Sequence, residues 1–204
     1  MRVPLRHLVL VLAAALLVAL TLACGREPAG GGGGGARKRA GTAEDPWLIG
    51  VSQCNLGEPW RVQMNEDLRN AAAKHPNLKL VFKDAQNDSL RQRAQVEELA
   101  GQGVDLLIIS PKEAAPLTRP VAEVHAKGTP VIVLDRAVEG EAFTVFIGAD
   151  NKKIGREAGA WIRKTLGGKG KVVELKGLMT STPGQDRHAG FREGLDLAQN
   201  PGLS

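Results

Sequence analysis

The sequence predicts an α/β protein in which a parallel sheet carries helices on both of its faces. Three observations lead to this prediction. From Trp47 onward, short apolar runs alternate with segments of helical periodicity. The apolar runs are continuous and not alternating, as in strands buried on both faces. Nearly every run ends in hydrogen-bonding side chains. Strands that alternate with helices form parallel sheets with right-handed crossovers.

The strands are expected where aliphatic and β-branched residues cluster between turn signals. They are predicted at residues 47–52, 78–83, 105–110, 130–135, 143–149 and 171–176. The fourth, "PVIVLD", and the fifth, "FTVFIGA", follow one another without a convincing helix between them. The last of the six is "KVVELK".

Five helices are expected between and after these strands, four of them from an apolar face at helical spacing. The first runs from Pro59 to His75; a second begins at Asp88 or Ser89, either of which can cap it. A third reaches about Lys127, where Gly128 ends it. The fourth spans 151–166, and the fifth follows the loop 177–184. The predicted apolar faces consist of Met64, Leu68, Ala71 and Ala72; Val96, Leu99 and Ala100; Ile154, Ala158, Trp161, Ile162 and Leu166; and Phe191, Leu195 and Ala198.

The first 23 residues are predicted to be a secretory signal. Two arginines precede an apolar run that ends before Cys24, and this run is too short to span a bilayer comfortably. A core helix is the alternative for the same run. "LTLAC" resembles the lipobox of bacterial lipoproteins, which implies lipidation at Cys24. Residues 24–46, with six consecutive glycines, are expected to form a flexible tether.

The composition argues against several classes of site. Residues 46–204 carry 21 basic and 19 acidic side chains, so no nucleic-acid footprint is present. The histidines lack metal-ligand spacing, and we expect no metal site and no cofactor. If Cys24 carries lipid, Cys54 is a lone thiol, which more often packs as a small apolar group than reacts.

The polar residues that follow the strands are expected to meet at one edge of the sheet. These residues are Ser52 and Gln53, Asp84 and Gln86, Ser110, Asp135 and Arg136, and Asp150 and Asn151. Ligands of open α/β sheets bind beyond the carboxyl ends of the strands. A surface ion pair is the alternative for Asp135 and Arg136.

Such an edge suits a sugar, whose hydroxyls need fixed planar hydrogen-bonding groups and whose C–H face needs a flat aromatic ring. An arginine supplies a rigid fork of donors and an aspartate supplies acceptors. Trp60 in "GEPWR" is the aromatic candidate, with Arg61 as a further donor beside it. A Trp60 that plugs the top of the core is the alternative.

Six segments in order resemble the periplasmic sugar-binding proteins of the ribose and galactofuranose type, the type I solute receptors of ABC importers. They are "VSQCNLGEPWR", "KDAQND", "QGVDLLIISP", "GTPVIVLDR", "GADN" and "VVELKG…DRHAGF". The resemblance covers Trp47 to the end of the chain. By position it implies a ligand-binding set of Ser52, Glu58, Trp60, Arg61, Asp135, Arg136 and Arg187.

The resemblance also implies two lobes of similar construction. Residues 47–149 would form the N-terminal sugar-binding lobe, and residues 150–204 an incomplete second lobe. The second-lobe ligands usual in the family, an aromatic residue, an Asn, an Asp and a Gln, are absent from the sequence given. We therefore expect residues 46–204 alone to bind a sugar weakly or not at all.

Other functions fit the sequence less well. An enzyme lacks support, since "GVSQC" is not a nucleophile elbow and "GGKGK" is not a phosphate loop. A lac-type repressor would need a helix-turn-helix ahead of Trp47. A sugar receptor that feeds a sensor kinase or a chemoreceptor would have the same ligand chemistry and stays open.

The sequence-based interpretation is an extracytoplasmic receptor that captures a monosaccharide and delivers it to the membrane subunits of an ABC permease. It would be a monomer, held by its lipid anchor in the periplasm or at the outer face of the cell membrane.

Overall fold

The computed structural model describes residues 38–204. The helices and strands, in chain order, are β1 (Trp47–Gln53), α2 (Pro59–Ala72), β2 (Leu78–Asp84), α3 (Ser89–Gly101), β3 (Leu106–Ser110), α4 (Ala114–Ala126), β4 (Val131–Leu134), β5 (Val145–Ile147), α5 (Asn151–Thr165), β6 (Lys169–Gly170), α6 (Thr182–Leu195) and β7 (Gly202–Leu203). The signal segment 1–23, Cys24 and the glycine run lie outside the described residues.

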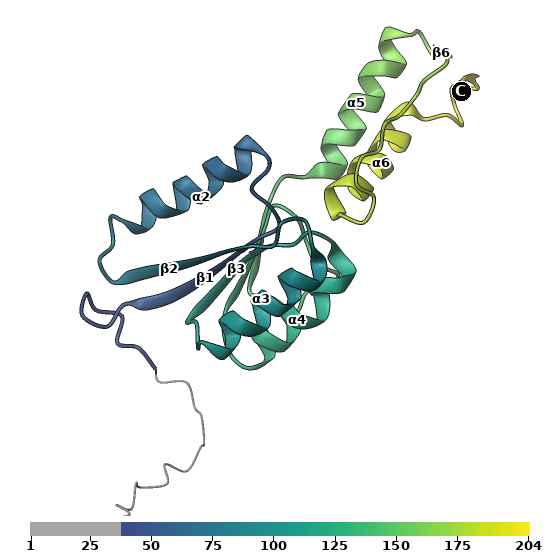
Figure 1. Ribbon diagram of the computed structural model, residues 1–204. Helices are drawn as coiled ribbons and strands as arrows, with labels where there is room; N and C mark the ends of the chain where they lie inside the picture. Colours follow the sequence, from purple (N-terminus) through teal and green to yellow (C-terminus); the bar gives the residue numbers. More distant parts are fainter. Residues whose placement is uncertain (1–37) are drawn as a thin grey trace, which may run out of the picture. The chain divides into compact units, whose positions relative to one another are not determined.

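Five strands form a parallel sheet in the order β2-β1-β3-β4-β5. Helix α2 lies on one face of this sheet, and α3 and α4 lie on the other (Figure 1). The predicted fold class is therefore confirmed. β5 joins β4 through a loop without a helix, as the sequence indicated.

The larger part of the core lies between the sheet and helices α3 and α4. Its centre consists of fully buried aliphatic side chains from α3, β3, α4 and β4: Val96, Leu99, Leu107, Ile109, Leu117, Val121, Val131 and Val133. A smaller cluster on the α2 face contains Ile49, Val51 and Ile108. Continuous apolar strands arise because both faces of the sheet have to be covered.

The predicted apolar face of α2 is confirmed in part: Leu68 packs against the smaller cluster and Met64 and Ala72 are half-buried, but Ala71 is exposed. The fully buried residues of this helix are Arg61 and Asn65. Both bond to strand ends: Arg61 donates to Gln53 and Ser110, and Asn65 Oδ1 accepts a hydrogen bond from Gln53 Nε2 at 3.3 Å. The start of α3 agrees with the sequence: the Asp88 carboxylate accepts hydrogen bonds from the backbone N–H groups of Leu90 and Arg91.

Helices α5 and α6 pack together through glycines. A β-carbon at Gly155 or Gly159 would overlap the backbone of α6, and one at Gly190 or Gly194 would overlap the backbone of α5. The backbones approach this closely because no side chain stands between them. The apolar face predicted for α5 is not the face that packs against α6, and its residues Ile154, Trp161 and Leu166 are all exposed.

The predicted strand at 171–176 is wrong. These residues belong to no helix or strand, and Val173 and Leu175 are 87% and 94% exposed. A strand needs a neighbour to accept its backbone hydrogen bonds, and within residues 38–204 only the short β6–β7 pair forms nearby. Ala198, expected on the last helix, lies beyond the end of α6 at Leu195.

Candidate functional site

The turn between β1 and α2 presents three of the predicted site residues. Glu58 is the N-cap residue of α2, and Pro59 follows at the first helical position, which its fixed φ angle favours. Trp60 and Arg61 then lie in the first turn of the helix. Trp60 is 46% exposed, whereas Arg61 is only 1% exposed, with its guanidinium carbon 4.4 Å from the centre of the Trp60 ring. The aromatic ring therefore rests on a buried cation.

Arg61 connects three strand ends to the start of α2. Its Nη1 donates to Gln53 Oε1 at 3.0 Å and to Ser110 Oγ at 3.1 Å. Its Nε donates to Glu58 Oε2 at 2.6 Å, and its Nη2 donates to Asp135 Oδ2 at 3.3 Å. A buried guanidinium is stable only when its donors are paired, and this fork pairs every one of its three nitrogens.

Asp135 follows β4 in a conformation that most side chains avoid. Its φ angle is 67°, in the left-handed region, which aspartate tolerates better than branched residues do. Its backbone N–H donates to the carbonyl of Ile147. Such a conformation persists where the surroundings fix it and is common at binding sites.

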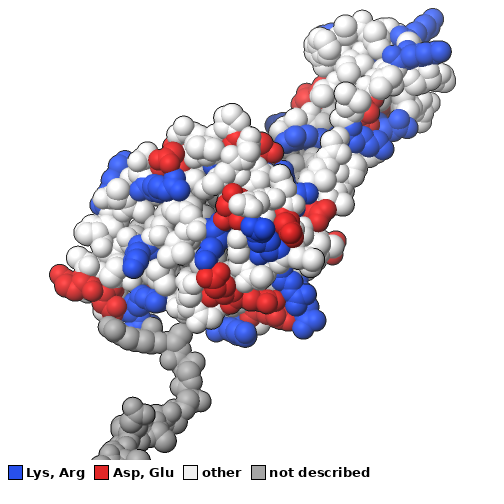
Figure 2. Space-filling view, in the orientation of Figure 1, with Lys and Arg blue, Asp and Glu red and all other residues white. Residues whose placement is uncertain are grey.

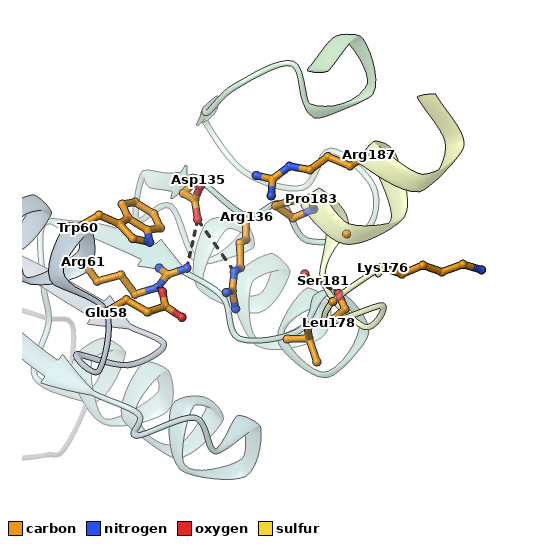
Figure 3. A pocket seen from close by; sticks show the side chains of 12 residues that line it. Glu58, Trp60, Arg61, Asp135, Arg136, Lys176, Leu178, Ser181, Pro183 and Arg187 are labelled. Carbon is orange, nitrogen blue, oxygen red and sulfur yellow. Dashed lines mark hydrogen bonds and ion pairs between the residues drawn. The ribbon is translucent and has the colours of Figure 1, made fainter. Parts of the chain in front are cut away.

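Arg136 turns back toward the same carboxylate. Its Nε lies 4.0 Å from Asp135 Oδ2, and its Nη1 donates to the carbonyl oxygen of Lys112 at 3.1 Å. The Asp135 carboxylate therefore lies between two guanidinium groups, as the dashed lines in Figure 3 show. Each guanidinium carries five N–H donors, and the hydrogen bonds described here use four in Arg61 and one in Arg136, so N–H donors remain for a ligand.

Two pKa values near this cluster are shifted. Partial burial raises the pKa of Glu58, but the hydrogen bond and the charge of Arg61 outweigh it, and the pKa lies below its ordinary value. Burial raises the pKa of the Cys54 thiol, against the opposing charges of Arg61 and Arg136. Glu58 is therefore ionised at neutral pH, and Cys54 is a neutral thiol there.

The start of α6 supplies the far side of the site. Thr182 Oγ1 accepts a hydrogen bond from the backbone N–H of Ala137, and the carbonyl of Thr180 accepts one from Ala114. Arg187 lies one turn into this helix, and its Nε donates to Asn151 Oδ1 at 2.8 Å.

The cluster around Asp135 and the start of α6 border an open cavity of about 490 Å³. Its lining consists of Glu58, Trp60, Arg61, Asp135, Arg136, Lys176, Gly177, Leu178, Ser181, Pro183, Gly184 and Arg187. Figure 3 shows that the Arg61 guanidinium and Arg136 Nε lie beside the Asp135 carboxylate, while Lys176 points away from this group. The volume falls within the range of small-molecule pockets, about 300–1,000 Å³.

The structure brings together six of the seven residues that the resemblance implied. The exception is Ser52, which is fully buried, is not part of the cavity lining, and accepts a hydrogen bond at Oγ from Gln92. Six further lining residues were not predicted from the sequence: Lys176, Gly177, Leu178, Ser181, Pro183 and Gly184. The Ser-Thr-Pro sequence at the start of α6 is the signal that could have placed Ser181 and Pro183 at a helix N-terminus.

Among residues 38–204, no group of His, Cys, Asp or Glu is arranged to hold a metal ion. The same part of the chain contains no helix that is long and apolar enough to cross a membrane. The predicted lipidation site, Cys24, lies outside the described residues.

A family model described as "Periplasmic binding protein domain" matches residues 49–204. The chain is 33% identical to the ribose import binding protein RbsB of Bacillus subtilis over 87% of this chain and 56% of that protein. It is 30% identical to the galactofuranose-binding protein YtfQ of Escherichia coli over 76% of this chain and 50% of that protein. The solved fructose-binding periplasmic domain of a hybrid two-component system is 40% identical, with a TM-score of 0.73, and the match covers 78% of this chain and 52% of that one. The chain thus spans about half the length of the relatives it matches.

Proposed function

The chain belongs to the periplasmic binding protein domain family, and we propose that it is part of an extracytoplasmic receptor that binds a monosaccharide for import by an ABC permease. The observation that carries this proposal is the cluster of Trp60, Asp135 and Arg136 at the carboxyl edge of the sheet. The relatives are binding proteins, which supports a role in solute binding and not in catalysis.

The cluster has the groups that a sugar requires. Asp135 uses Oδ2 for Arg61, so its other carboxylate oxygen is left to accept hydrogen bonds from hydroxyl groups. Arg136 has further N–H donors beside the one bound to Lys112. The half-exposed Trp60 ring offers a flat apolar surface for the C–H face of a sugar. Charge-assisted hydrogen bonds of this kind contribute about 1.5–3 kcal/mol each when they are sheltered from water.

The surface charges show no pattern of the kind that a nucleic acid would require. Acidic and basic side chains are interspersed over the face shown in Figure 2, without a large region of one sign. A nucleic-acid partner would require a basic surface, so we do not propose one.

Titration of the 204-residue chain with pentoses and hexoses tests the proposal. The reporter is the indole N–H signal of Trp60 in a ¹H–¹⁵N NMR spectrum, which also detects weak binding. The sequence alone left weak binding and no binding open, but six of the implied residues line one cavity, so we expect a weak and saturable shift with at least one neutral monosaccharide. Trp60→Ala lacks the reporter indole and is therefore followed through the backbone amide signals of the same spectrum. This variant should no longer bind, while Trp161→Ala, which removes an exposed indole outside the cavity, should bind as the wild-type chain does. The absence of saturable binding by every sugar in the panel would falsify the proposal.

A receptor that signals to a sensor kinase is a second candidate. The similarity to the fructose-binding domain of a hybrid two-component system favours it. The ligand chemistry would be the same, and only the partner would differ. Deletion of the gene distinguishes the two: loss of labelled-sugar uptake supports a permease partner, and loss of sugar-induced transcription with normal uptake supports a sensor kinase.

We also propose that Cys24 carries a lipid that anchors the chain at the outer face of the cell membrane, the lipobox-like "LTLAC" being its support. Incorporation of labelled palmitate tests this. We expect label in the wild-type chain and none in Cys24→Ser, and equal labelling of the two would contradict the anchor.

A further inference from the structure

Gln92 is a polar residue buried on a helix face that would otherwise be apolar. It lies in α3 between the N-cap Asp88 and the core residue Val96, and it has no exposed surface. A buried amide destabilises a fold unless its hydrogen bonds are made. Its position therefore requires partners.

Both ends of the Gln92 amide are bonded. Its Nε2 donates to the carbonyl oxygen of Ser110 at 2.9 Å and to Ser52 Oγ at 3.2 Å. Its Oε1 accepts a hydrogen bond from the backbone N–H of Lys112 at 2.8 Å. One side chain thus holds the backbone on both sides of Pro111, where β3 ends and the loop to α4 begins.

This loop provides an acceptor for each of two arginines of the cavity. Ser110 Oγ accepts from Arg61 Nη1 at 3.1 Å, and the Lys112 carbonyl accepts from Arg136 Nη1 at 3.1 Å. The acceptors belong to the same two residues whose backbones Gln92 binds. A shift of the loop would therefore move both guanidinium groups relative to Asp135, which lies between them.

We propose that Gln92 is a positioning residue of the ligand site: by fixing residues 110–112, it sets the orientation of Arg61 and Arg136 without touching the ligand itself. It lies outside the cavity lining. Its effect on sugar affinity rests on the function proposed above, whereas its effect on the two arginines does not.

The first test uses the arginine Nε–H NMR signals of the unliganded 204-residue chain, assigned with Arg61→Lys and Arg136→Lys. Gln92→Met keeps the length of the side chain and removes its hydrogen bonds. We expect the signals of both arginines to shift or broaden in this variant. Gln95→Met is the matched control on the same helix, because the Gln95 amide donates to the Asp84 carbonyl and not to the loop. The control should leave both signals in place.

Gln92→Glu is the isosteric variant, in case Gln92→Met does not fold. One carboxylate oxygen can still accept from the Lys112 N–H, but the other faces the Ser110 carbonyl oxygen, and two acceptors repel each other. We therefore expect the signals of both arginines to shift or broaden in Gln92→Glu as well. Unchanged arginine signals in a folded Gln92→Met or Gln92→Glu protein would overturn the proposal.

The second test measures monosaccharide affinity by the same Trp60 titration. We expect Gln92→Met to weaken binding about tenfold in the wild-type background. In an Arg136→Ala background the same substitution should have a much smaller effect, because the effects of interacting residues on affinity are not additive. An equal effect in both backgrounds would exclude action through Arg136. If no monosaccharide binds the wild-type chain, the proposed function fails, and the arginine signals still decide the role of Gln92.

Discussion

The replacement Arg61→Met removes a side chain that joins the start of α2 to three strand ends. The methionine fills a similar volume but makes none of the four hydrogen bonds, to Gln53, Ser110, Glu58 and Asp135. The loss affects the stability of the fold and the geometry of the cavity together, because Arg61 is both buried and part of the lining.

The expected magnitude follows from the environment of the partners. The Glu58 and Asp135 carboxylates are 44% and 26% exposed, so water can solvate them after the substitution. Gln53 and Ser110 are buried and lose a charged donor, and each such hydrogen bond contributes about 1.5–3 kcal/mol. Relief of the desolvation of the guanidinium offsets part of this loss. We therefore expect the free energy of unfolding to fall by about 3 kcal/mol, the lower end of the sum for two bonds.

Urea and thermal unfolding of the 204-residue chain measure this effect, and a loss of 3 kcal/mol corresponds to a decrease of about 6–12 °C in Tm. Arg69→Met is the matched control on the same helix, since the Arg69–Glu66 ion pair is exposed and such pairs contribute about 0–1 kcal/mol. An Arg61→Met variant no less stable than Arg69→Met would refute the network as described.

Three further substitutions test other parts of the account. Gly190→Ala should destabilise the fold by about 1–3 kcal/mol in urea unfolding, because its methyl group would overlap the Lys152 carbonyl. Gly101→Ala is the control, since the space around it is open, and it should stabilise the fold by about 0.5–1 kcal/mol. Equal effects of the two substitutions would argue against close packing of α5 and α6. Glu58→Gln should have a lower free energy of unfolding than the wild type near pH 7, because the folded-state pKa of Glu58 is lowered and its carboxylate therefore stabilises the fold above its ordinary pKa. This difference should vanish well below pH 4.5, where Glu58 is protonated. A difference that persists in acid contradicts the ion pair. Asp88→Ala should lower the urea midpoint through loss of the N-cap of α3, and no change in this midpoint would count against the cap.

Periodicity and turn residues were sufficient to predict the first sheet and its helices. The five strands begin and end close to the predicted residues, because each is a continuous apolar run between turn signals. The meeting of strand ends also followed from the parallel order, which places Gln53 beside Ser110 and Asp84. This order explains why Asp135 and Trp60 face the same cavity although they are far apart in the sequence.

The errors come from polar residues that are buried and apolar residues that are not. A sequence pattern assigns Arg61, Asn65 and Gln92 to the surface, since it cannot show that strand ends offer them partners. The opposite error occurs at 171–176, where an apolar run predicts a strand but Val173 and Leu175 have no neighbouring strand among the described residues. Tertiary partners decided both cases.

The central claim is that a monosaccharide lies against Trp60, between the arginines and Asp135. Nuclear Overhauser effects between the ring protons of a sugar and the indole protons of the 204-residue chain test this claim most directly. We predict contacts to Trp60 in the wild-type chain and their loss in Asp135→Asn. Contacts to Trp47 or Trp161 in place of Trp60, or contacts that persist unchanged in Asp135→Asn, would contradict the account.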